Sequence, residues 1–267
     1  MDRGPLTDVE RPAGRKRENS AMTQDLFREN AYLKECTAVV TAVGEAAITL
    51  DRTVFYPLGG GQAGDAGVLV LADAAELVIA DTRKGRDEDG RPSADIVHVP
   101  APGQEALLAR LQPGTALTAR VDWERRHRLM RFHTTTHLLC HLVPQLVNGC
   151  SITPEYARLD FNMTAPLDKE ALTAGIARLV AAALPVQVGS ISDAELDANP
   201  ALVKSMSVQP PRGTGRVRTI RIGDSEQVDF QPCGGTHVAN TAEIGPVTVT
   251  KIEKKSATTR RVVLGFA

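Results

Sequence analysis

The sequence predicts two domains, a small all-β barrel or sandwich followed by an α+β domain with a mostly antiparallel sheet. Two observations lead to this prediction. From Tyr32 to Trp123, short segments alternate apolar and polar residues between Gly, Pro and Asp, whereas later segments alternate helical with strand patterns. The chain of 267 residues is also long enough to bury two separate cores.

Short strands are expected throughout the first part of the chain. The segments with strand patterning are residues 35–43, 46–57, 67–85, 94–101 and 115–123. Residues 1–23 lack the apolar stretch of a secretory signal, so we expect a disordered extension, and Met22 would be a more ordinary start. The predicted β domain therefore occupies residues 24–124.

The pattern changes at residue 124. The segment 124–147 places Leu129, Phe132, Thr136, Leu139 and Val143 at helical spacing, with a bend or end at Pro144. The elements expected after it are strands at 157–163, 186–192, 216–222, 245–253 and 260–266, an Asp-capped helix at 167–186 and a short helix at 192–199. These elements predict an α+β domain over residues 125–267.

Bulk composition excludes some classes of function. The net charge is -1 and aromatic residues make up 4%, so a nucleic acid would be held by local basic patches rather than by a global positive field or an aromatic platform. No apolar run reaches the ~20 residues of a membrane span. The four cysteines lack the spacing of a disulfide framework, which favours a reducing cytoplasm.

Two short motifs predict a metal site. In "HTTTH", His133 and His137 lie four residues apart on the expected helix, so both imidazoles project from one face. In "CGGTH", Cys233 and His237 come from a glycine-rich turn far along the chain. A ligand set with one thiolate and several imidazoles favours zinc.

Each motif alone also has an ordinary structural explanation, a solvated helix face or a turn that contains a cysteine. His141 is a weaker candidate, because it lies about 80° around the helix from His133. No glutamate follows His133, so the metalloprotease pattern HExxH is absent.

The segments "DWERRHRLMRFHTTTHLLCHLV" and "DFQPCGGTHVANTAEIGPVTVTKIEKKSATTRRVVL" resemble the editing domain of alanyl-tRNA synthetase, and more closely the freestanding AlaX-type editing proteins of medium length. The upstream "TVFYPLGGGQAGDAG" resembles the glycine-rich motif of the same family. The resemblance covers residues 24–267. It implies a translation-factor-like barrel followed by the α+β fold of the threonyl- and alanyl-tRNA synthetase second additional domain.

The resemblance also implies a function. The expected activity is that of a cytoplasmic zinc-dependent hydrolase that acts in trans and removes serine, or glycine, from tRNA(Ala). It implies one zinc ion per chain, held by His133, His137, Cys233 and His237. A catalytic zinc usually has three protein ligands and an open position, so we expect one of the four, His237, to be distant, loosely bound or displaceable.

The remaining expectations concern substrate contacts. Gln62 in "GGGQAGD" is expected to orient the substrate and Thr53 to read the serine hydroxyl, whereas Thr134 and Thr136 are expected to pack or to bond to the backbone. Three basic runs suggest a groove for the tRNA acceptor end. Its expected contacts are Arg128, Arg131, Arg260 and Arg261, within runs that also contain Arg125, Arg126, Arg212, Arg216, Arg218, Arg221, Lys254 and Lys255.

No Walker-type loop is present, so we expect no use of ATP. Two alternatives stay open at this point. One is a non-catalytic zinc-containing module of the same fold that binds tRNA or protein. The other is a hydrolase of a different small ester or amide.

Overall fold

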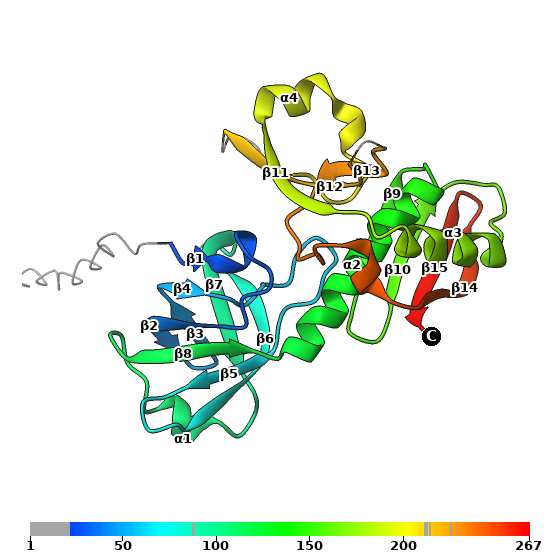
Figure 1. Cartoon of the computed structure of the whole chain (residues 1–267). Coiled ribbons are helices and arrows are strands. Elements are labelled where there is room, and N and C mark those ends of the chain that lie inside the picture. Colours follow the sequence, from blue (N-terminus) through cyan, green and yellow to red (C-terminus); the bar gives the residue numbers. More distant parts are fainter. Residues whose placement is uncertain (1–21, 87–88, 211–212, 214, 225) are drawn as a thin grey trace, which may run out of the picture.

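The computed structural model describes residues 22–86, 89–210, 213, 215–224 and 226–267 (Figure 1). Most of the extension expected at residues 1–23 lies outside these residues. Within the described part, Thr23 is buried and its hydroxyl donates to the Leu50 carbonyl at 2.9 Å, so the last residue of the expected extension belongs to the folded part of the chain.

The first part of the chain is a closed antiparallel barrel. Its six strands pair in the ring order β2-β3-β7-β6-β5-β8. The elements are β1 (Gln24–Asp25), the 3-10 helix η1 (Leu26–Arg28), β2 (Glu35–Gly44), β3 (Ala47–Leu50), β4 (Arg52–Thr53), β5 (Gly67–Val70), β6 (Glu76–Arg86), β7 (Pro92–Pro100), α1 (Glu105–Leu108) and β8 (Ala116–Val121). Apolar and polar residues alternate along each strand, and the apolar side chains fill the interior of the barrel. Ile48, Leu69 and Ile79 are fully buried there.

A long helix, α2 (Trp123–Leu142), leads out of the barrel. Asp122 begins it, because its carboxylate accepts from the backbone N–H of Arg125 at 3.1 Å, and the helix ends just before Pro144. The later elements are β9 (Val147–Ile152), β10 (Ala157–Asn162), α3 (Lys169–Ala181), β11 (Val186–Ser192), α4 (Asp193–Ala198), η2 (Pro200–Leu202), β12 (Arg216–Ile222), β13 (Asp229–Pro232), η3 (Thr241–Ile244), β14 (Val247–Ser256) and β15 (Thr259–Phe266).

The later strands form two sheets, not the single sheet expected. One has the order β14-β15-β10-β9 and the other the order β11-β12-β13, and all neighbours are antiparallel. Strand β9 was missed, because "VNGCSI" contains Asn and Gly, which are depleted in strands. The expected Asp cap of α3 is present, since Asp168 accepts from the Ala171 N–H at 2.9 Å.

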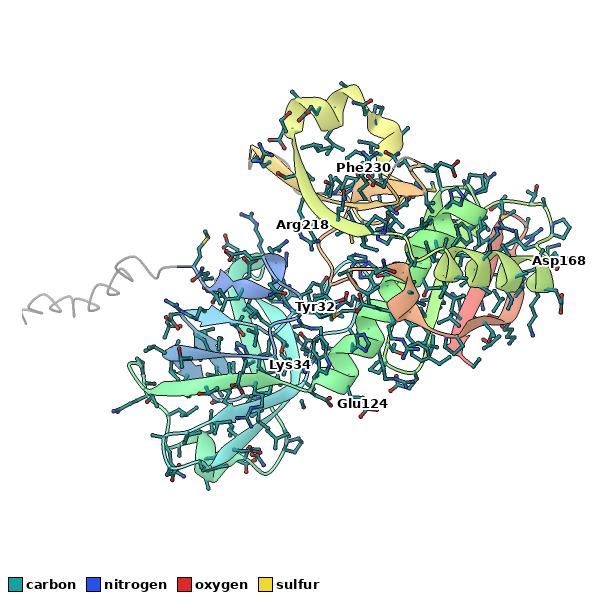
Figure 2. The ribbon with its side chains drawn as sticks, viewed as in Figure 1. Tyr32, Lys34, Glu124, Asp168, Arg218 and Phe230 are labelled. Carbon is teal, nitrogen blue, oxygen red and sulfur yellow. The ribbon has the colours of Figure 1, made fainter. Side chains whose placement is uncertain are left out.

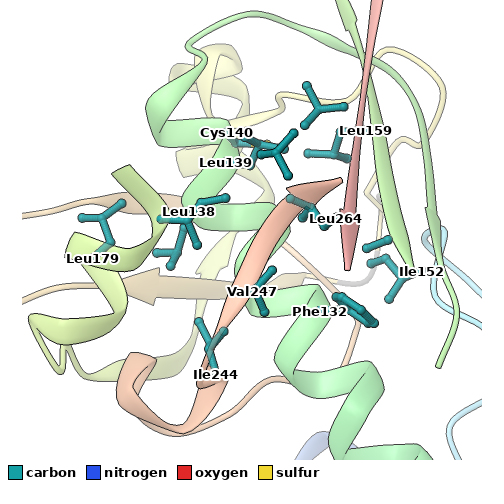
Figure 3. Close-up of a cluster of buried hydrophobic side chains, with 14 of the residues drawn as sticks. Phe132, Leu138, Leu139, Cys140, Ile152, Leu159, Leu179, Ile244, Val247 and Leu264 are labelled. Atoms are coloured by element: carbon teal, nitrogen blue, oxygen red, sulfur yellow. The ribbon is translucent and has the colours of Figure 1, made fainter. Parts of the chain in front are cut away.

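Helix α2 also supplies the second core. Its apolar side chains, including Phe132, Leu138 and Leu139, are fully buried and pack with Val247 and Leu264 from the four-stranded sheet (Figure 3). The intervening positions of the same helix are polar and buried, among them both histidines of "HTTTH". The helix therefore presents a core face and a polar face inside the same protein interior.

A buried ion pair joins the barrel to this helix. The Arg126 side chain is fully buried, and its Nε donates to both carboxylate oxygens of Asp65, at 3.0 and 2.9 Å. The same guanidinium donates to the carbonyls of Ala31 and Val54, and Asp65 also accepts from the Tyr56 N–H at 2.6 Å. Arg126, which belongs to one of the basic runs, thus stabilises the fold and is inaccessible to a tRNA.

Among the described residues, no helix combines the length and apolar character needed to cross a membrane.

Replacing Arg126 with Met should lower the free energy of unfolding by about 3–5 kcal/mol, because the Asp65 carboxylate would remain buried without its partner. The matched control is Arg120→Met, since Arg120 pairs with Glu35 on the surface and its side chain is 46% exposed. That change should cost below about 1 kcal/mol. Urea unfolding measures both values, and equal losses would contradict a special role for the buried pair.

His98 gives the barrel a pH dependence. Burial lowers the pKa of His98 to about 4, although the hydrogen bond to the Ile48 carbonyl opposes this. The unfolded chain therefore binds a proton more readily than the folded one, so the stabilisation is complete above about pH 6.5 and is lost as the pH falls. The loss should reach about 2 kcal/mol at pH 5. Between pH 7 and pH 5, the free energy of unfolding should change less with pH in His98→Gln than in the wild-type protein. An equal pH dependence in both proteins would refute the assignment.

Candidate metal centre

Four side chains converge in the polar region beside α2. His133, His137, Cys233 and His237 bring their ligand atoms within 4.8 Å of one another. The Cys233 Sγ lies 3.4 Å from Nε2 of His133 and 3.3 Å from Nε2 of His237. Ligands on a tetrahedral zinc are about 3.6 Å apart, given its usual Zn–S and Zn–N bond lengths. One thiolate and three imidazoles in this arrangement fit zinc.

Each imidazole is oriented by an acceptor on its other nitrogen. The acceptors of the Nδ1 hydrogens are Gln62 Oε1 for His133 at 2.6 Å, Asp229 Oδ2 for His137 at 2.7 Å and Thr134 Oγ1 for His237 at 3.2 Å. Thr134 acts as an acceptor because its own hydrogen goes to the Met130 carbonyl at 3.0 Å. With Nδ1 protonated, every Nε2 carries a free lone pair, which is the arrangement that metal-binding histidines adopt.

Two glycines allow the segments to approach this closely. A Cβ on Gly235 would lie 2.1 Å from Cε1 of His133, so only glycine fits between Cys233 and His237 at this point. Gly61 has a φ of 84°, and a Cβ there would lie 2.8 Å from the Cys150 Sγ. The sequence "CGGTH" therefore contains a glycine that the packing of His133 requires.

The charges of the site favour ligation. Burial alone would raise the pKa of Cys233, but His133 and His237 outweigh it and hold that pKa well below its ordinary value. For His137 burial is outweighed by Asp229, which raises the pKa to about 9. Lys204 also contacts Asp229. A thiolate is thus available at neutral pH, and a metal bound by His137 would displace the proton of this imidazole.

The position of His237 differs from the expectation. It is 5% exposed, and its Nε2 belongs to the same close group as the other three ligand atoms, so it is not distant. His141, in contrast, is exposed and stands outside the group.

Gln62 reaches the site, but its amide is engaged with protein groups. Its Oε1 also accepts from the Thr236 N–H at 3.2 Å, and its Nε2 donates to the Thr236 hydroxyl at 2.9 Å. These contacts are those of a residue that positions His133. The glycine-rich segment that carries Gln62 pairs with the end of β9, where the Ala63 N–H donates to the Ile152 carbonyl at 2.9 Å.

Thr53 does not fit the expected role of a hydroxyl reader. It is fully buried in the barrel, its hydroxyl lies 2.8 Å from Nε2 of His98, and it accepts from the Phe55 N–H at 3.0 Å. Since Nδ1 of His98 donates to the Ile48 carbonyl, the Thr53 hydroxyl donates to Nε2. Both of its bonds are used inside the barrel, which leaves none for a substrate.

Several expected tRNA contacts are internal ties as well. Arg260 is 9% exposed and donates to the carbonyls of Ser256, Thr259 and Thr164. Arg261 holds Asp160 through Nε and Nη2, at 2.7 and 2.8 Å. Arg260 is thus engaged inside the fold, whereas Arg261 is partly exposed and stays a candidate tRNA contact. Arg212 lies outside the described residues.

Arg128 and Arg131 remain partly exposed, and their guanidinium groups lie over the ring of Phe266 at 4.6 and 4.0 Å. They remain candidates for phosphate contacts.

Two contributors to the site were missed by sequence reasoning. Asp229 was not among the expected site residues, and Thr134 was expected to pack or to bond to the backbone. Thr134 does bond to the backbone, and it also orients His237. Asp229 reaches His137 because β13 pairs with β12, a register that the sequence pattern does not specify.

Comparison with known proteins adds independent findings. Residues 217–263 match the family model "Threonyl and Alanyl tRNA synthetase second additional domain". The chain is 32% identical over 249 residues to "Alanyl-tRNA editing protein AlaX-M" of Methanosarcina barkeri, covering 90% of this chain and 98% of that protein. The protein of the same name from Saccharolobus solfataricus is 30% identical over 245 residues, with the same two coverages.

Longer proteins are similar over part of their length. The "Alanine--tRNA ligase" of Ignicoccus hospitalis is 34% identical over 238 residues, which are 87% of this chain but 24% of the ligase. The chain thus spans about a quarter of the ligases it matches.

The hydrogen bond from His137 to Asp229 should contribute to metal affinity. Asp229→Asn should weaken zinc binding roughly 10- to 100-fold, because Asn cannot supply the carboxylate charge behind the imidazole. Competition with a chromophoric chelator measures the affinity. Asp160→Asn is the matched control, since Asp160 is paired with Arg158 and Arg261. An equal effect of both changes would contradict the assignment.

Proposed function

The chain belongs to the AlaX-M family of alanyl-tRNA editing proteins, and from this premise we propose that it is a zinc-dependent hydrolase that deacylates mischarged Ser-tRNA(Ala) in trans, with Gly-tRNA(Ala) as an alternative substrate. The observation that carries the proposal is the Cys/His group with all three Nδ1 hydrogens held by outer partners. Support for action in trans comes from the 98% coverage of the AlaX-M relatives.

Zinc held by His133, His137, Cys233 and His237 would supply a Lewis acid for the ester carbonyl or for water. The chain's own residues prepare that chemistry. Gln62, Asp229 and Thr134 fix the imidazole rings, so the ligands need not reorganise during the reaction. Burial of the three histidines excludes bulk water from the site and strengthens its electrostatic interactions.

Discrimination against alanine follows from the polar character of a buried site. A hydrogen-bonding group that is satisfied by the serine hydroxyl would stay unpaired beside alanine, at a cost of about 1–3 kcal/mol. That penalty spares correctly charged Ala-tRNA(Ala). Because the Thr53 hydroxyl is hydrogen-bonded to His98, Thr53 is not proposed as the residue that recognises the serine hydroxyl.

We further propose that the chain divides into a translation-factor-like barrel at residues 24–124 and an editing domain at residues 125–267. Two separate clusters of buried apolar residues support this division. A cytoplasmic location is also proposed, and the four free cysteines support it.

A second candidate function is a non-catalytic tRNA- or protein-binding module with a structural zinc. The close approach of all four ligands favours this alternative, because four protein ligands are typical of a closed structural site.

Deacylation assays separate the two candidates. The wild-type protein should release serine from Ser-tRNA(Ala) while largely sparing Ala-tRNA(Ala). Cys233→Ala should lose roughly 100-fold or more of this activity, since the metal supplies several kcal/mol of transition-state stabilisation.

Arg83→Gln, a change of an exposed barrel residue paired with Asp81, should retain wild-type activity. A folded, zinc-loaded protein that releases neither amino acid would support the binding module instead.

A further inference from the structure

Two arginines flank the exposed part of the metal-binding loop. Arg218, on β12, donates from Nη1 to the Cys233 carbonyl at 2.7 Å and to the Gly235 carbonyl at 3.0 Å. Arg28, at the end of η1, places its Nη1 3.6 Å from the position that a Cβ on Gly234 would occupy. Gly234 is exposed whereas the next four residues are buried, so both guanidinium groups lie at the open side of the loop.

One edge of Arg218 has no acceptor. Nε and Nη2 of an arginine form a two-donor edge that fits a carboxylate or phosphate. In this protein Arg126 uses that edge for Asp65, and Arg261 uses it for Asp160. Among the described residues none accepts from this edge of Arg218, and its Nε is buried without a hydrogen-bond partner.

The surroundings of Arg218 contain a second guanidinium group, that of Arg28, together with the Cys233 thiol, and they are held in place. It extends from the sheet β11–β13 toward the barrel (Figure 2), where its electrostatic neighbours include Arg28, Tyr56 and Asp25. Phe27 packs edge-on against Tyr56 at 5.4 Å between ring centroids, which anchors η1 and therefore Arg28. Asp25 is engaged by the Nε of Arg28, so the Nη groups of Arg28 are left for another anion.

We propose that Arg218 and Arg28 form an anion clamp for the phosphodiester on the 5′ side of the terminal adenosine of the aminoacyl-tRNA. This proposal rests on the proposed function. In that substrate the carboxyl group of the amino acid is esterified, so the phosphate one ribose away is the anion closest to the scissile bond. Arg218 donates a hydrogen bond to the backbone carbonyl of the proposed metal ligand Cys233. The clamp therefore lies close to the metal centre, as the phosphate lies close to the scissile bond in the substrate.

Two minimal substrates test the clamp, 2′(3′)-O-seryl-adenosine 5′-monophosphate and 2′(3′)-O-seryl-adenosine, which lacks the phosphate. Charge-assisted hydrogen bonds should give the wild-type protein a roughly 10- to 100-fold higher kcat/KM on the phosphorylated substrate. Arg28→Gln and Arg218→Gln should each remove most of this advantage, and Arg28→Gln should leave kcat/KM on seryl-adenosine unchanged. Arg83→Gln should keep the advantage intact.

The outcomes separate the clamp from the proposed function. Hydrolysis of both substrates at equal kcat/KM by the wild-type protein would overturn the clamp and leave the editing activity standing. Absence of any hydrolysis, including that of Ser-tRNA(Ala), would overturn the proposed function itself. If Arg218→Gln loses zinc because the loop shifts, Arg28→Gln decides, since no hydrogen bond joins Arg28 to the described residues of that loop. An equal loss on both substrates in Arg28→Gln would also refute the clamp.

Discussion

The arrangement of the metal centre depends on the buried pair of Arg126 and Asp65. Arg126 precedes His133 by two helical turns on the same face of α2, and Asp65 follows Gln62 by three residues on the glycine-rich segment. The ion pair between Arg126 and Asp65 therefore also places Gln62 beside His133. There Gln62 accepts the Nδ1 hydrogen of His133. The barrel thus contributes directly to a site whose proposed ligands all come from the later part of the chain.

Around this tie, most of the site's polar groups serve to orient other groups. Gln62, Thr134 and Asp229 each accept the Nδ1 hydrogen of one imidazole. The Nε2 lone pairs of the three histidines are therefore directed toward the same candidate metal position. Unsatisfied polar groups would be costly at such depth, and nearly every buried donor near the metal has an acceptor. The unpaired Nε of Arg218 is the exception there among the described residues, which is why it points to a ligand.

The same reasoning changes how basic residues are interpreted. Arginines near each other in the sequence suggested a continuous groove for nucleic acid. Arg126 instead stabilises the fold through the buried carboxylate of Asp65, Arg260 through backbone carbonyls, and Arg261 through the partly exposed carboxylate of Asp160. An arginine can bind a phosphate only through donors that the fold leaves free, such as the Nε edge of Arg218 and the Nη groups of Arg28, and which donors are free is a property of the folded chain.

The sequence by itself determined the strand-rich first part, helix α2 with its Asp122 cap and the two metal-binding motifs, because local periodicity and ligand spacing encode these features. It also indicated the family, which the comparison with relatives confirmed. Only the tertiary structure decided that His237 lies close to the other candidate ligands, that Thr53 bonds to His98, and that Asp229 reaches His137. These outcomes depend on strand register and on contacts between residues far apart in the chain, which no local pattern specifies.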